Sequence, residues 1–159
     1  MTIQPMWCPR TITAQIVLLI FVTCPPAWAV LGGSPGGIAM DHQLLVGEIH
    51  TVTAPGYSVQ ELTTQDLVVR EYVSPGGVVF AVSWAGRRSP DLPALFGSYF
   101  EQYATASANR DPKRSPLRGI TRIETPQLVV ETGGPMGTVW GNAYLPLEFP
   151  AGVTKEAIR

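Results

Sequence analysis

Residues 66–85 read DLVVREYVSPGGVVFAVSWA, which is two β-prone runs on either side of the turn-forming segment Ser74–Gly77. Proline presets the backbone angle of a turn's second residue, and glycine supplies the positive φ that follows it. The second run alternates, and its large apolar residues share one face: Val78, Phe80, Val82 and Trp84. The pattern therefore predicts a β-hairpin with one buried face.

Similar runs on both sides of this hairpin extend it into a sheet. The run from Tyr57 precedes it after a short polar turn, and two later runs flank a second turn at Thr132–Pro135. Short strands joined by such turns are typical of antiparallel pairing. The expected strands are 57–62, 66–73, 78–85, 127–132 and 137–145.

One amphipathic helix is expected between the third and fourth of these strands. Its apolar residues recur at helical spacing: Leu92, Leu95, Phe96, Tyr99, Phe100 and Tyr103. Asp91 is the predicted N-cap and Asn109 the predicted end, while Gly97 inside the helix costs about 1 kcal/mol relative to alanine. The fold class is therefore α+β. A three-stranded meander and a later hairpin form one antiparallel sheet. The helix between them is expected to pack on the face that carries Val78, Phe80, Val82 and Trp84.

Residues 1–29 have the features of a secretory signal peptide. Arg10 is the single charged residue, residues 16–22 form a short apolar core, and Ala27-Trp28-Ala29 suits a signal peptidase. Cleavage is expected before Val30, with export to the periplasm or the extracellular space. Seven apolar residues are too few to span a bilayer, which needs about 20, so no transmembrane segment is expected in the mature chain. A lipid-modified Cys24 is the less favoured alternative, because Phe21-Val22-Thr23 is a poor lipobox.

The remaining chain is expected to be one domain. Residues 30–55 are predicted to be a flexible lead, with a short helix within 38–49, and residues 56–159 a single α+β domain. Both cysteines, Cys8 and Cys24, lie in the leader, so the mature domain has no disulfide. Without Arg10, 10 basic residues stand against 12 acidic ones. This balance lacks the basic footprint of a nucleic-acid-binding protein.

Several segments resemble one bacterial family. The hairpin from Val69 to Trp84 is the strongest match, and it is supported by Leu31-Gly32-Gly33, by Pro90-Asp91-Leu92 with 95–100, and by Ala143–Pro146 with 150–153. Together they resemble the exported family called domain of unknown function 2844. The turn at Thr63–Asp66 departs from that family because it lacks glycine. The resemblance implies a Gram-negative envelope or secreted setting, and it brings no activity, cofactor or catalytic residue.

No residue pattern predicts catalysis, a cofactor or a metal site. His42 and His50 lie near Asp41 and Glu48, but their spacing matches no ligand pattern, and solvated surface histidines are favoured. None of the glycine pairs precedes Gly-Lys-Ser/Thr. Ser98 lies in the helix stripe rather than in a nucleophile elbow.

A partner surface is the remaining candidate site. Exposed tryptophans near strand ends and basic residues of the loop 110–122 are its expected members: Trp84, Arg110, Lys113, Arg114 and Trp140. The loop could contact lipid head groups or a cell-wall polymer, although a solvated loop is favoured. Arg70 and Glu71 point to opposite faces of their strand, and a cross-strand ion pair is the favoured interpretation.

Three functions remain open. The favoured one is a non-enzymatic envelope domain that binds an envelope protein or polymer or has a structural role. The second is a small hydrolase that uses carboxylates such as Glu71, Glu131 or Glu148. The third is a peripheral protein on anionic membranes. The sequence leaves the partner and the oligomeric state open.

Overall fold

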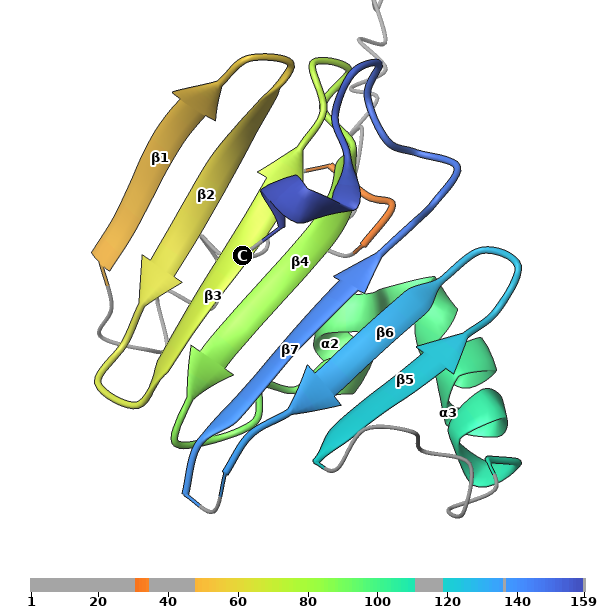
Figure 1. Ribbon diagram of the computed structural model, residues 1–159. Helices are drawn as coiled ribbons and strands as arrows, with labels where there is room; N and C mark the ends of the chain where they lie inside the picture. Colours follow the sequence, from red (N-terminus) through yellow and green to blue (C-terminus); the bar gives the residue numbers. More distant parts are fainter. Residues whose placement is uncertain (1–30, 35–47, 111–118, 136, 159) are drawn as a thin grey trace, which may run out of the picture.

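The computed structural model describes residues 31–34, 48–110, 119–135 and 137–158, and these form one antiparallel sheet with helices on one face. The sheet has seven strands in the order β1-β2-β3-β4-β7-β6-β5 (Figure 1). The strands are β1 Glu48–Ala54, β2 Tyr57–Thr63, β3 Leu67–Val73, β4 Val79–Gly86, β5 Ile120–Glu124, β6 Val129–Gly133 and β7 Val139–Tyr144. The helical elements are α2 Leu92–Phe96, η1 Gly97–Tyr99, α3 Phe100–Ala108 and η3 Lys155–Ala157.

The chain builds the sheet in two passes. Strands β1 to β4 follow one another as a meander, and the helices then carry the chain to the far edge. It returns through β5 and β6 to β7, which pairs with β4. The expected α+β class with an antiparallel sheet is confirmed. The order differs, because a four-stranded meander and a three-stranded unit replace the expected meander and hairpin.

Two strands were not predicted. β1 lies in the segment expected to be a flexible lead, where Glu48 and Ile49 are strand rather than helix. The rest of the expected short helix lies outside the described residues. β5 lies in the expected polar connection. Both strands lie at sheet edges, and β1 buries neither face, so neither shows a clear alternation of apolar and polar residues.

The expected single helix is interrupted at Gly97. The Asp91 side chain accepts a hydrogen bond from the Ala94 amide at 3.4 Å, which confirms the N-cap of α2. Asn109 is the C-cap of α3, which confirms the predicted end. Gly97 has a φ of 49°, which side-chain-bearing residues rarely adopt, and a 3-10 turn follows it. The helical path therefore has a break between α2 and α3, and the apolar residues of both still pack on the sheet.

One core lies between the helices and the sheet face that they cover, which we call the helix face. Phe96 is fully buried there, with ring centroids 6.0 Å from Trp84 and 5.1 Å from Tyr103. Phe100 is only partly buried. Strand residues from both passes complete this core: Val69, Val73, Val79, Val82, Val130 and Ala143.

A β-bulge in β4 changes the expected register. Tyr72 pairs with Ala81 and Val73 with Val79, so Phe80 is the extra residue between them. Val82 and Trp84 face the helices as predicted, but Phe80 points to the opposite face, and Val78 precedes the strand. The prediction that Phe80 shares a face with Val82 was wrong, because a bulge shifts the alternation by one residue.

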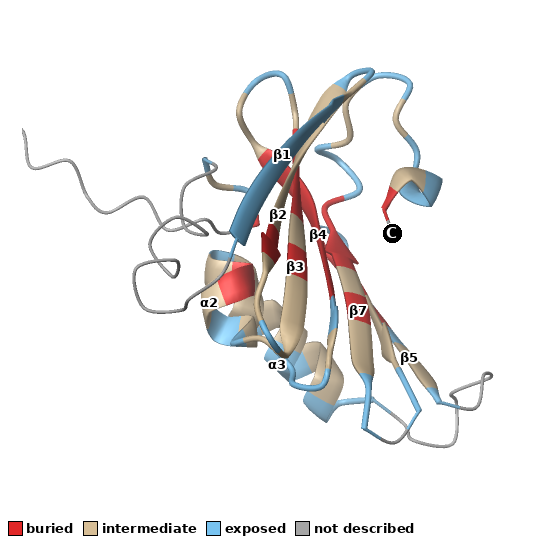
Figure 2. Cartoon of the chain, turned by 90° about the vertical axis from the view of Figure 1, so that its left-hand side faces the viewer, coloured by how far each residue is buried: buried red, intermediate tan, exposed pale blue. Residues whose placement is uncertain are grey.

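Phe80 belongs to a second core on this opposite face, which we call the outer face. The segment 145–158 crosses it, and Phe149 lies 5.2 Å from Phe80 and 5.6 Å from Tyr144 between ring centroids. Figure 2 shows the helices on one side of the sheet and the C-terminal segment on the other. The middle strands are therefore covered on both faces.

The first described residues also belong to the fold. Leu31 is buried, and its amide donates to the Leu95 carbonyl at 3.2 Å. Gly32 and Gly33 exchange backbone hydrogen bonds with Val79 at 2.8 and 3.0 Å. Residues 31–33 thus connect α2 to the start of β4, and they are not a flexible lead.

Candidate functional site

A groove of about 360 Å³ lies on the outer face, over the part of the sheet that the C-terminal segment leaves uncovered. Three strands and η3 contribute its lining: His50, Val52, Tyr57, Val59, Glu61, Arg70, Tyr72 and Ala157. Outward-facing residues of neighbouring strands lie side by side in a sheet, so this lining follows directly from the register of β1, β2 and β3.

The floor of the groove is aromatic and apolar. The rings of Tyr57 and Tyr72 lie 6.1 Å apart between centroids, and each also contacts Phe80 below the C-terminal segment. The Tyr72 hydroxyl lies 3.5 Å from the Ser83 Oγ, and Val59 pairs directly with Tyr72. These contacts pack the two tyrosine rings against each other and against Phe80.

An ion pair forms the polar side of the groove. The Arg70 Nε donates to the Glu61 Oε2 at 2.6 Å, and the two residues lie opposite each other in the β2–β3 ladder. Both side chains are partly buried. The expected cross-strand ion pair at this position is therefore present. It holds a guanidinium and a carboxylate beside the aromatic floor, with His50 further out on β1.

Glu71 lies on the other side of the sheet from the groove. It pairs with Val82 on the helix face, is 1% exposed, and its Oε2 has no hydrogen-bond partner. Burial raises the pKa of this carboxyl to about 7. The Trp84 Nε1 is likewise buried without a partner.

The carboxylates considered for hydrolysis do not converge. Glu131 pairs with Arg122 on the outer face, whereas Glu71 faces the helices, so the sheet itself separates these two groups. Glu148 is exposed in the segment after β7. No pair among these three lines the groove.

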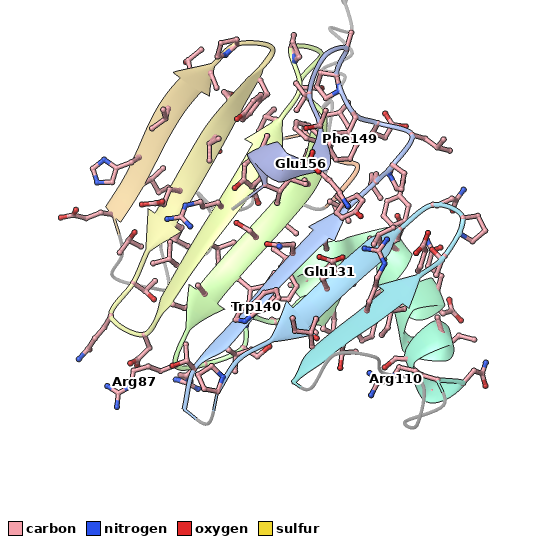
Figure 3. All side chains as sticks on the ribbon, in the orientation of Figure 1. Arg87, Arg110, Glu131, Trp140, Phe149 and Glu156 are labelled. Carbon is pink, nitrogen blue, oxygen red and sulfur yellow. The ribbon has the colours of Figure 1, made fainter. Side chains whose placement is uncertain are left out.

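The expected partner-surface residues lie apart from one another. Trp84 is 3% exposed on the helix face, so the expectation of an exposed tryptophan was wrong there; its indole lies over Gly141, where a Cβ would collide with it. Trp140 is half-buried on β7 and Arg110 is exposed beyond the edge of the sheet (Figure 3). Arg110 donates to the Thr121 Oγ1 at 2.7 Å. Lys113 and Arg114 lie outside the described residues.

Sequence reasoning missed the groove because it missed β1. His50 and Val52 line the groove only when residues 48–54 pair with β2. A usable signal was present, since Ile49, Thr51, Val52 and Thr53 are β-branched within seven residues.

Neither a metal-ligand cluster nor a membrane-spanning helix occurs in the part of the chain that the structure describes. Within the described ranges, no three His, Cys, Asp or Glu side chains gather as metal ligands would, and His42 and Asp41 lie outside those ranges. In the same part of the chain, no helix is long and apolar enough to cross a membrane.

The fold and the groove together define an α+β domain with a single antiparallel sheet and a groove on its outer face. The chain matches, over residues 27–158, the family described as "Protein of unknown function (DUF2844)", and it belongs to that family. The resemblance predicted from the sequence is thus confirmed. No curated protein and no solved structure matches the chain.

Proposed function

We propose that this protein is an exported, non-enzymatic binding domain of the bacterial envelope, and that the outer-face groove holds its ligand. The groove carries this proposal, because it joins an aromatic floor to a fixed ion pair at an open surface. Binding sites combine such apolar area with a few well-placed polar groups. The groove's volume falls near the lower end of the roughly 300–1,000 Å³ that is usual for small-ligand sites.

A segment of a glycan polymer suits this lining best. The partly exposed ring of Tyr57, which packs against the buried Tyr72, offers apolar area to the C–H face of a sugar ring. Arg70 and Glu61 offer donors and acceptors to its hydroxyl groups. Cell-wall glycan is the abundant polymer of this kind in the expected compartment.

Co-sedimentation with purified peptidoglycan sacculi tests the binding. The wild-type protein should pellet with sacculi, and Arg70→Gln should weaken the association at least tenfold, because it removes the charged donor beside the floor. Arg122→Gln is the matched control, since Arg122 pairs with carboxylates on the same face but outside the groove. A wild-type protein that stays in the supernatant, or equal losses in both variants, would contradict the proposal.

Mass spectrometry of material from an exporting host tests the location. A chain that begins at Val30 would support export with removal of the leader. An intact Met1 terminus or a lipid-modified Cys24 would contradict it.

A further inference from the structure

β1 is an edge strand without the usual protection against pairing. All seven of its residues pair with β2 in an unbroken register, and six of them are exposed. Its exposed apolar side chains include Ile49, at 38%, and Val52, at 61%. The strand contains no proline or lysine, its regular register leaves no bulge, and its one carboxylate, Glu48, lies at the first position and not in the middle of the edge. Natural edge strands generally carry at least one of these protections.

The opposite edge of the sheet is protected. β5 is shorter, at five residues, and carries Arg122 and Glu124. Helix α3 packs beside it, and Arg110 from the end of α3 bonds to Thr121. The two edges of one sheet are thus built differently, which singles out β1 as the edge that is open to another strand.

The β1 sequence is compatible with its own copy. In an antiparallel pair, all seven residues find partners in the register that centres on Thr51. There Val52 lies opposite His50 of the second copy, Ile49 opposite its Thr53, and Glu48 opposite its Ala54, so no like charges meet. The same symmetric pairing of β5 would place Arg122 against Arg122, which is unfavourable.

We propose that β1 pairs with β1 of a second copy of this chain, about a two-fold axis at Thr51. The two seven-stranded sheets then join into one continuous sheet. Val52 becomes covered by the second copy's His50, and the grooves of both copies become neighbours across the seam. A single strand edge buries less than the roughly 800 Å² per partner of a standard interface, so we expect a weak dimer whose population depends on protein concentration.

Sedimentation velocity over a concentration series tests this pairing. The wild-type protein should shift from monomer to dimer as its concentration rises. Thr51→Lys and Thr51→Glu should each raise the dissociation constant at least tenfold, because like charges then meet at the axis. An equimolar mixture of the two variants should restore the dimer. Thr51 is exposed, so either charge remains solvated in the monomer, and circular dichroism checks the fold.

Thr105→Lys on the exposed side of α3 is the matched control and should dimerise like the wild type. A wild-type protein that stays monomeric up to about 1 mM overturns the proposal and leaves the open edge to a strand of another protein. A dimer that both Thr51 variants retain, or a mixture that fails to re-form it, places the interface elsewhere and overturns it as well.

Discussion

The two sides of the central strand β4 contain the same number of strands, but their edge strands and outer surfaces differ. On one side, β7, β6 and β5 end in a short, charged edge strand beside α3. On the other, β1, β2 and β3 carry the outer-face groove and end in an exposed strand. Both halves contribute to the buried cores, so the comparison shows that the difference between them lies in their edge strands and in the groove.

The ion pairs of the two halves sharpen this contrast. Arg122 contacts Glu124 and Glu131 on the surface of its half. Arg70 contacts Glu61 inside the groove of the other half. Chemically similar pairs thus lie on one face, but one of them borders space that a ligand can occupy.

Loss of the Phe96 ring should have the largest effect, because this fully buried residue anchors the helices on the sheet through its contact with Trp84. Phe96→Ala should lower the free energy of unfolding by about 3–5 kcal/mol, the usual cost for a buried phenylalanine. Phe100→Ala should cost less, since Phe100 is only partly buried. Urea melts of both variants and of the exposed control Ser98→Ala measure the ranking. A larger loss for Phe100→Ala would mean that α3 rather than α2 anchors the helices on the sheet.

Glu71→Gln should change how stability depends on pH. The folded-state pKa of Glu71 is about 7 against an ordinary 4.5, so the folded protein retains this proton longer than the unfolded chain. The contribution of protonated Glu71 to the free energy of unfolding is therefore complete below pH 4.5. It falls as the pH rises from 4.5 to 7, and it stays low above pH 7. The total change is about 3 kcal/mol at most.

Urea melts of the wild type and Glu71→Gln between pH 4 and 9 isolate this effect as a difference. The free energy of unfolding of Glu71→Gln should rise relative to that of the wild type as the pH rises, and the variant should be the more stable protein at pH 8. A difference that stays constant over this range would show that the carboxyl is not held in its neutral form by burial.

Gly141→Ala should be more damaging than an exposed glycine substitution. An added Cβ at Gly141 would collide with the Trp84 indole in the helix-face core, and overpacking of this kind costs about 1–3 kcal/mol. Gly76→Ala is the control, because a Cβ there meets only the Ser74 hydroxyl at 3.8 Å. Thermal melts compare the two. Equal melting temperatures would mean that Trp84 can move away from β7.

Removal of either arginine should have the smallest effect on stability. Arg70→Gln and Arg122→Gln should each lower the free energy of unfolding by less than about 1 kcal/mol, as is usual for partly solvated ion pairs. Chemical denaturation measures this. A much larger loss of unfolding free energy for Arg70→Gln would mean that the Arg70–Glu61 ion pair stabilises the fold. Weaker binding by this variant would then need a second test, with His50→Ala.

Sequence patterns predicted the fold where one face of a strand is buried or a turn is marked. The strands around Tyr72, Trp84 and Val130 were found within one or two residues, because their apolar residues are bounded by glycine or polar turns. β1 was missed because it buries nothing. The bulge at Phe80 was missed because 78–82 is apolar on both faces, so the run fits either register.

The groove could not be predicted for a related reason. It depends on long-range pairing that brings Tyr57 beside Tyr72, and on segment 145–158, which packs on the middle strands and borders the groove through Ala157. Local periodicity contains no information on where such a segment crosses a sheet. The ion pair was anticipated only because Arg70 and Glu71 are adjacent and must face opposite ways.

Leu31 and Ile158, close to the two ends of the described fold, are both buried, one on each face of the sheet. An exopeptidase that trims the chain from either direction would reach a core residue before it reached a strand. Resistance to such trimming is thus coupled to the stability of the whole domain. Such trimming therefore favours all-or-none survival, in which a molecule is either intact or degraded.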